Sequence, residues 1–198
     1  MTLDAFLALL AFAFVSSVTP GPNNMMLMAS GVNFGFRRTI PHMFGIAVGF
    51  VSLLLAVGFV LGGLLAAYPA LEKAMKWLSA AYLLWLAWKI ASARGIGTGR
   101  ETSRPMTFAE AALFQWVNPK AWTMALAAMG AYTSADAPVL SVLIVSLAFG
   151  LVNLPSVSVW TTFGVALRSL LANPRRLRVF NIAMALLLAV SLWPMLQH

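Results

Sequence analysis

The sequence predicts an all-α integral membrane protein with six transmembrane helices, arranged as two inverted three-helix repeats. Its 198 residues are 61% hydrophobic and only 9% charged, with a mean hydropathy of +0.88, whereas a soluble domain is about 25% charged. The length accommodates about six spans with short loops, so we expect a single membrane domain over residues 1–198 and no soluble domain. Two apolar segments, at corresponding positions in the two halves, are interrupted by proline and polar residues.

The first expected span runs from about Leu3 to Met28 and continues toward Asn33. It lies in a stretch of 32 residues, from Ala5 to Phe36, that carries no charged side chain. As one continuous helix this stretch would be about 48 Å long, against roughly 30 Å for the hydrocarbon core of a bilayer. A break near mid-depth would let the two apolar pieces span the membrane together.

The break is expected at the run Thr19-Pro20-Gly21-Pro22-Asn23. Pro20 and Pro22 lack an N–H, so each frees the backbone carbonyl four residues earlier. Lipid cannot satisfy such carbonyls, and only protein, a ligand or trapped water can. A broken helix at membrane depth is therefore a candidate binding site. Asn23 follows the break, where its side chain can cap the second half-helix and tie it to a neighbour.

The second expected span runs from about His42 to Ala67, after a link from Asn33 to Ile40. Pro41 suits the first turn of a helix, and His42 is expected at the membrane interface. Gly45 and Gly49 lie four residues apart on one helix face, which is the small-residue spacing of close helix packing.

The third expected span covers about Ala74 to Ala91. Its Trp and Tyr side chains are typical of interfacial anchors or packing residues rather than of a cofactor site. The polar stretch 94–106, which is rich in glycine and arginine, follows as a linker. It divides the chain into a first half over residues 1–93 and a second half over residues 107–198.

The fourth expected span, about Thr107 to Tyr132, contains Gln115, Asn118, Pro119 and Lys120 as a second polar break. Lys120 lies about 20 Å from the start of this span, too deep to reach water easily. A lysine at that depth costs about 3 kcal/mol or more and is a functional candidate. The alternative is a structural lysine paired with freed carbonyls. On an unbroken helix Lys120 points about 140° away from Gln115, so both face one site only if Pro119 distorts the helix.

The fifth expected span, about Val139 to Leu167, is interrupted by Gly150, Asn153 and Pro155, and the sixth runs from about Val179 to Leu196. Pro155 frees a third carbonyl beside the amide of Asn153. Each amide alone contributes only about 1 kcal/mol or less as contact between helices. Three breaks with amides in one small bundle favour a common polar cavity.

The distribution of basic residues predicts the orientation. The links after the first, third and fifth expected spans hold 2, 4 and 4 Lys or Arg residues, whereas the opposite side holds only Lys73 and Lys76. Basic loops face the cytoplasm, so both termini are expected outside. With three spans per half, the halves start on opposite sides, which makes them an inverted repeat of the kind found in secondary transporters.

The expected cavity suits a small zwitterion such as an amino acid. Half-helix N-termini and Lys120 favour a negative group, and the freed carbonyls favour a positive one. The sequence places no acidic residue at mid-depth, so a bare cation would not explain Lys120. Four residues are candidates for a pocket around the substrate side chain: Met25, Trp116, Trp122 and Phe149.

Four motifs occur in order along nearly the whole chain: Thr19-Pro20-Gly21-Pro22-Asn23, Gly35-Phe36-Arg37, Gly45-x-x-x-Gly49 and Gln115-x-x-Asn118-Pro119-Lys120-Ala121. They resemble the LysE/RhtB family of bacterial amino-acid exporters. The resemblance implies a proton-driven exporter in the cytoplasmic membrane, with amino acids such as lysine, threonine or leucine as substrates. The site residues it implies are Pro20, Gly21, Pro22, Asn23, Asn118, Pro119 and Lys120. Many members carry a glycine four residues before the glutamine, where this chain has Ala111.

Other functions are weaker readings of the same residues. A metal or cation exporter would use Met25, Met26 and Met28 as soft ligands, but methionines in an apolar helix are mostly packing residues and the chain has no cysteine. No motif of a membrane enzyme occurs, so we expect neither catalytic residues nor a cofactor nor a metal. The net charge of +8 indicates cytoplasmic loops and anionic lipid rather than nucleic acid. A six-helix bundle is small, so a homodimer is a further expectation to test.

Overall fold

The computed structural model describes residues 1–61, 69–92, 104–134 and 136–190. Within these ranges the chain is helical and contains no strand. The elements are α1 (Leu3–Val18), α2 (Pro22–Phe34), α3 (Phe36–Ala56), the π-helical turn η1 (Val57–Leu61), α5 (Pro69–Ala91), α6 (Phe108–Gln115), α7 (Pro119–Tyr132), α8 (Pro138–Leu167) and α9 (Pro174–Val190). The prediction of an all-α protein is confirmed for these residues.

Two helices are long and apolar enough to cross a membrane alone: Phe36–Val60 and Pro138–Leu167. A third span results if α1 and α2 are taken together, which are joined by a short break and bent by 53° relative to each other. The predicted break of the first span is therefore present between Val18 and Pro22. The number of six spans and the orientation remain predictions, because helix length and composition among the described residues support only these two or three.

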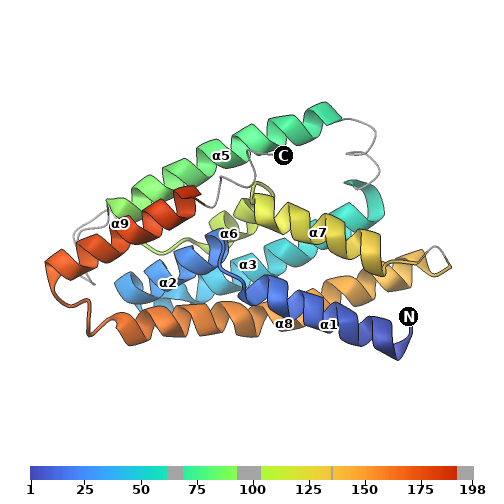
Figure 1. Cartoon of the computed structure of the whole chain (residues 1–198), viewed down its shortest axis with the longest axis horizontal. Helices are drawn as coiled ribbons and strands as arrows, with labels where there is room; N and C mark the ends of the chain where they lie inside the picture. The colour runs from blue at the N-terminus through green and yellow to red at the C-terminus, as the bar shows by residue number, and fades with distance from the viewer. Residues whose placement is uncertain (62–68, 93–103, 135, 191–198) are drawn as a thin grey trace.

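The longest uninterrupted helix, α8, lies along both α1 and α2 (Figure 1). Its closest approach is to α2, where Gly31 faces the backbone of Thr161 and Gly164 faces the backbone of Met28. A methyl group at either glycine would overlap the opposing carbonyl oxygen. The two glycines therefore let the helix backbones approach more closely than larger side chains would allow. This glycine pair is not part of the sequence prediction.

A second close contact joins α3 to α6. Gly45 lies against the carbonyl oxygen of Phe108, and a methyl group at Gly49 would lie 2.6 Å from the Cα atom of Ala112. The two glycines that the sequence singles out thus lie where these helices meet. Ala111 also lies at this contact, because a methyl group added at Gly45 would lie 2.7 Å from the Cβ atom of Ala111. The residue that departs from the family pattern is therefore buried at this contact.

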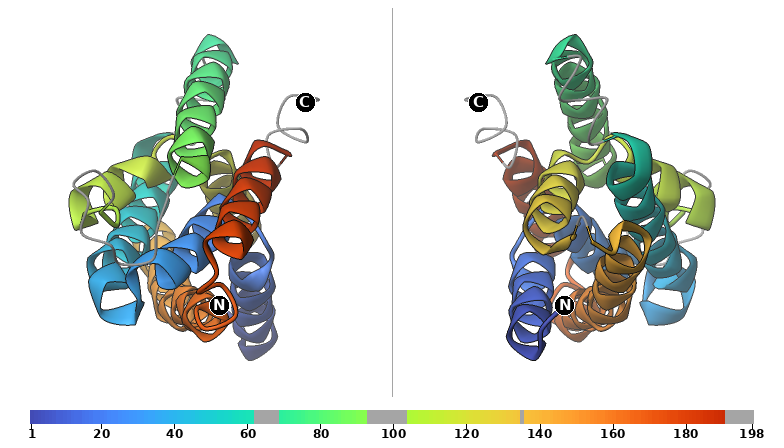
Figure 2. Two further views of the ribbon diagram at one scale, coloured as in Figure 1. Left: turned by 90° about the vertical axis from the view of Figure 1, so that its left-hand side faces the viewer. Right: turned by 90° about the vertical axis from the view of Figure 1, so that its right-hand side faces the viewer.

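The largest apolar core lies between α1, α3, α7 and α8. At its centre the Phe149 ring meets the rings of Phe12 and Phe50 edge-on, with centroids 6.0 Å and 5.5 Å away. Helices α5 and α9 pack beside each other and stand outside this group, with α2 between them and the core (Figure 2). A buried amide pair, in which Asn33 Nδ2 donates to Asn181 Oδ1 at 3.1 Å, links α2 to α9.

The expected interruption of the fifth span is wrong, and so are the expected starts of the second, third and sixth spans. The fifth span is not interrupted, because α8 continues through Gly150, Asn153 and Pro155 without a break. One missing N–H removes a single helical hydrogen bond, and the packing of α8 against α1, α2, α3, α7 and η1 holds the helix together. The second span begins at Phe36 rather than His42, since Gly35, with a φ of 81°, ends α2 and lets α3 start at once. Pro41 accordingly lies inside α3 and not in its first turn.

Parts of the prediction fall outside the described residues. They are the end of the second span from residue 62 to 67, most of the linker 94–106, and the end of the sixth span from residue 191 to 196. The third span begins five residues earlier than expected, at Pro69, and ends at Ala91 as expected. The sixth span also begins five residues earlier than expected, at Pro174. The fourth span begins and ends within one residue of the prediction.

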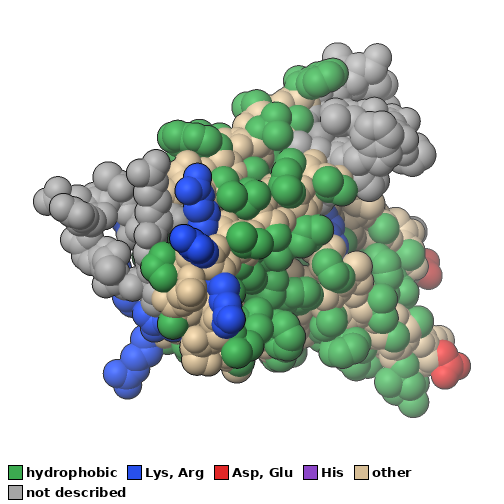
Figure 3. All heavy atoms as spheres, turned by 60° about the vertical axis from the view of Figure 1, so that its left-hand side comes forward, with side chains coloured by type: hydrophobic (Ala, Val, Ile, Leu, Met, Phe, Trp, Pro, Cys, Tyr) green, Lys and Arg blue, Asp and Glu red, His purple; other side chains and the backbone are tan. Residues whose placement is uncertain are grey.

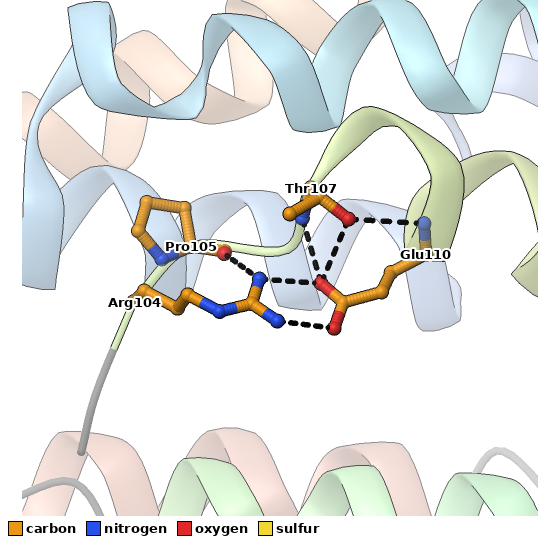
Figure 4. A network of polar contacts seen from close by, with 4 residues as sticks. All are labelled: Arg104, Pro105, Thr107 and Glu110. Carbon is orange, nitrogen blue, oxygen red and sulfur yellow. Dashed lines mark hydrogen bonds and ion pairs between the residues drawn. The ribbon is translucent and has the colours of Figure 1, made fainter.

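The start of α6 is held by an ion pair at its surface (Figure 4). Arg104 donates two hydrogen bonds of 2.7 Å to the carboxylate of Glu110. The same carboxylate accepts from the Thr107 backbone N–H, and the Thr107 side chain caps the helix in return. The hydrogen bonds and the charge of Glu110 raise the pKa of the Arg104 guanidinium above its ordinary value. Most of the Lys and Arg side chains visible in Figure 3 gather toward one end of the molecule.

Candidate functional site

The break between α1 and α2 leaves backbone carbonyls at the C-terminal end of α1, and side chains from other elements satisfy them. Asn24 Nδ2 donates to the carbonyls of Ser17 and Thr19, at 2.9 Å and 3.0 Å. Trp160 Nε1, from α8, donates to the carbonyl of Val18 at 3.2 Å. This last carbonyl is one of the two freed by the prolines. The broken backbone is thus stabilised by protein groups, as a break surrounded by lipid requires.

The second break separates α6 from α7. Helix α6 ends at Gln115, and α7 begins at Pro119 with Asn118 as its N-cap, whose side chain accepts from the N–H of Lys120 at 3.2 Å. Inside the break, Trp122 Nε1 donates to the carbonyl of Trp116 at 2.8 Å. The helix therefore stops and restarts within a few residues, which changes the directions of the side chains on either side.

The two breaks meet through a pair of amides. Asn23 Nδ2 donates to Gln115 Oε1 at 2.8 Å, and Gln115 Nε2 donates to Asn23 Oδ1 at 3.1 Å. Asn118 adds a longer contact of 3.5 Å to Gln115 Oε1. Asn23 lies inside the first turn of α2 and does not cap it, because Pro22 already begins the helix and Gly21 is its N-cap. Its expected role as a cap is wrong, whereas the contact with a neighbour is present.

Lys120 reaches from α7 to the first break. Its Nζ donates to the carbonyl oxygen of Thr19 at 2.5 Å. Because the helix is interrupted before Pro119, Gln115 and Lys120 face the same space, as the sequence requires if both serve one site. In this structure the ammonium bonds a carbonyl at the end of α1.

A small cavity lies between the two breaks. Its lining includes six of the predicted site residues, Gly21, Asn23, Gln115, Asn118, Lys120 and Asn153. The three predicted prolines do not line it, but Pro22 and Pro119 each begin the helix that follows a break. The cavity has a volume of about 20 Å³, which is room for roughly one water molecule. An amino acid fits only after the surrounding helices move apart.

Two buried polar atoms of cavity-lining residues have no partner among the described residues. They are the Oγ atom of Ser17 and the Oδ1 atom of Asn153. Buried polar atoms are nearly always hydrogen-bonded in folded proteins. These two are therefore candidates for contacts to a bound molecule or to water.

The apolar wall of the cavity differs from the expected one. It consists of Phe50, Ala121 and Met124. Of the four candidates for a side-chain pocket, Phe149 and Trp122 belong to the packed core instead. Met26 and Met28, proposed as soft metal ligands in the alternative reading, lie in hydrophobic clusters. No group of three or more His, Cys, Asp or Glu residues within the described ranges could hold a metal ion.

Sequence reasoning missed several residues of the site. Trp160 lies 142 positions from the carbonyl that it satisfies, and no local pattern points to it. Asn24 was not missed, but the sequence ranks it below Asn23, because it lies one residue further from the Pro-Gly-Pro break. Phe50 looks like any other apolar residue of α3.

His42, which is expected at the membrane interface, is buried within the protein; its depth in the membrane stays a prediction. Its side chain is 1% exposed, and neither ring nitrogen has a hydrogen-bond partner among the described residues. The spacing of His42 and Gly45 on one helix face places both toward α6. An isolated histidine in a hydrophobic stretch carries no sequence signal that distinguishes these two locations.

Comparison with known proteins gives a consistent result. A family model described as LysE type translocator matches residues 14–191. A protein from Escherichia coli O1:K1 / APEC, named cysteine/O-acetylserine efflux protein, is 29% identical over 189 residues, which cover 95% of each chain. Proteins of the same name from Escherichia coli strain K12 and Shigella sonnei strain Ss046 are 28% identical over the same share. No solved structure matches the chain.

Proposed function

Because the chain belongs to the LysE type translocator family, we propose that it is a secondary active exporter of amino acids or their close derivatives. It acts in the bacterial cytoplasmic membrane and uses the proton gradient as its driving force. The observation that carries the proposal is the meeting of two broken helices around one lysine, in a cavity lined by amides. Interrupted helices at corresponding positions are typical of substrate sites in such transporters.

The proposed topology has six spans in two inverted halves, with both termini outside. The helices α1–α2 and α6–α7 are the first spans of the two halves, and each is interrupted. The excess of basic residues in three links supports a cytoplasmic location for those links. Transport by alternating access then requires the two halves to open the cavity first to one side and then to the other.

The substrate is proposed to bind as a zwitterion. Lys120 holds its carboxylate, directly or through water, and the carbonyls at the end of α1 accept its ammonium group. Asn23, Gln115 and Asn118 orient it, and Asn153 offers an unpartnered oxygen. As it stands the cavity has room for about one water molecule, so binding of an amino acid requires the surrounding helices to move apart.

Cysteine and O-acetylserine are the first substrates to test, because the relatives that cover 95% of the chain are named for their efflux. Both molecules carry an amino group and a carboxylate beside a short side chain. The modest size of the apolar wall, formed by Phe50, Ala121 and Met124, is compatible with such a side chain.

The proposal is tested by export from cells. Cysteine and O-acetylserine are measured inside and outside cells that produce the chain, the Lys120→Met variant or neither. We expect external amino acid to rise only with the unaltered chain, and Lys120→Met to abolish export while folded protein stays in the membrane.

Lys89→Met is the matched control, since Lys89 lies over the Trp85 ring, 4.5 Å from its centroid, and outside the cavity. It should export as the unaltered chain does. Equal external amino acid in all cells, over a panel of amino acids, would sink the proposed function. Full export by Lys120→Met would remove the role given to that lysine.

A further inference from the structure

The C-terminal end of α1 is a concentrated acceptor site. The carbonyls of Ser17, Val18 and Thr19 all accept hydrogen bonds from side chains of other elements. The partial negative charge of a helix C-terminus favours a cation there, yet the last turn of α1 contains no basic residue. The cation is supplied from α7, by Lys120.

Gly21 directs the lysine to this place. A methyl group on Gly21 would lie 2.6 Å from Lys120 Cδ and 3.1 Å from its Nζ. The lysine stem thus lies where a side chain at position 21 would be, and its ammonium comes to rest on the Thr19 carbonyl. No acidic side chain lines the cavity among the described residues, so the ammonium has a backbone carbonyl as its partner and no carboxylate.

Building on the proposed function, we propose that the Thr19 carbonyl recognises the amino group of the exported molecule, and that the Lys120 ammonium occupies it when no substrate is bound. In the empty site, the Lys120 ammonium then takes the place of the substrate's amino group. An arriving ammonium group takes over the carbonyl, because two cations cannot share it without strong repulsion. The released lysine turns to the carboxylate of the same molecule.

This exchange explains why one site needs both the Thr19 carbonyl and the Lys120 ammonium. A molecule with an amino group alone could displace the lysine but would leave it without a partner in a partly buried place, which is costly. A molecule with a carboxylate alone could not take over the Thr19 carbonyl. The exchange therefore selects molecules that carry both groups.

The test uses the purified full chain and a simple amine as the probe. In Lys120→Met the Thr19 carbonyl has lost its cation, so ethylammonium chloride should fill the vacancy and raise the melting temperature by about 2–4 °C. Tetramethylammonium chloride at the same concentration has the same charge but no N–H, and it should give no such rise. The unaltered chain and Lys89→Met should respond equally to the two salts.

Equal melting temperatures of Lys120→Met in the two salts would overturn the proposal. If Lys120→Met is not recovered as folded protein, Gly21→Ala makes the same comparison, because its methyl group pushes the lysine stem away from Thr19. The outcome of this melting experiment can be distinguished from the outcome of the export experiment. Export by the unaltered chain with no amine effect in either variant removes only the exchange, whereas absence of export removes the function itself.

Discussion

At the scale of single residues, the polar groups of this chain collect at its two helix breaks. The carbonyls that Pro20 and Pro22 expose, and the amides that follow them, would each be costly in an apolar surrounding. The structure pairs the amides of Asn23 and Gln115 with each other and places Trp160 on the freed carbonyl of Val18. Asn24 and Lys120 bond the neighbouring carbonyl of Thr19. The breaks are thus stable without ligand, and their polar groups lie ready for exchange with one.

His42 is one of the exceptions to this pairing, like Ser17 Oγ and Asn153 Oδ1 in the cavity. Both of its ring nitrogens are buried without a partner in the part of the chain that the structure describes. Removing such unpaired groups is often neutral or stabilising. We therefore expect His42→Leu to unfold at the same temperature as the unaltered chain or a few degrees higher, measured by tryptophan fluorescence on purified protein.

His42→Gln, which keeps polar atoms at the same place, is the control and should be no more stable than the unaltered chain. A clear loss of stability in His42→Leu would mean that the ring has a partner. A stable His42→Leu that has lost export would give the histidine a part in transport.

At the scale of helices, close backbone contact decides which elements lie side by side. Helices α2 and α8 meet at Gly31 and Gly164, where each glycine faces the backbone of the other helix. Adding a methyl group here forces two helices apart, because neither backbone can yield as a flexible side chain can. A proline alone does not break a helix in this fold, since Pro155 lies inside the continuous helix α8.

We expect Gly164→Ala to destabilise the protein by about 1–3 kcal/mol. Gly130→Ala is the matched control, since Gly130 lies in α7 with no atom within 4 Å of its added methyl group. It should be neutral or stabilising by about 0.5–1 kcal/mol. Thermal unfolding of both variants in the same detergent makes the comparison, and equal stability would show that α2 and α8 can separate freely.

At the scale of the whole molecule, the orientation across the membrane can be measured directly. The chain contains no cysteine, so a single introduced cysteine reports its own side. Ser134 lies between α7 and α8, Ser169 follows α8, and both are exposed. With both termini outside, a membrane-impermeant maleimide should label Ser134→Cys in intact cells and Ser169→Cys only after permeabilisation.

The cysteine-free chain, treated in the same way, gives the background. The opposite labelling pattern would place the termini in the cytoplasm and reverse the proposed direction of the two halves. Labelling of both positions from outside would mean that α8 does not cross the membrane.

Much of the fold followed from local sequence patterns. Hydropathy predicted the helical class, and the run of residues 19–23 predicted a break that the structure contains. The fourth span was predicted within one residue at each end, and in the structure a local capping box of Thr107 and Glu110 sets its start. The expected interruption near Asn153 was wrong, because a proline in a sequence does not reveal the packing that keeps its helix continuous.

Local sequence alone specifies that the chain is helical and apolar, that its first and fourth segments are interrupted, and that one lysine lies beside an interruption. These properties depend on neighbouring residues, since proline removes a hydrogen bond wherever it occurs. Only the tertiary structure decided that Lys120 bonds the carbonyl of Thr19, 101 positions away. Contacts over such a separation depend on how helices pack, and packing depends on the shapes of all the side chains between them.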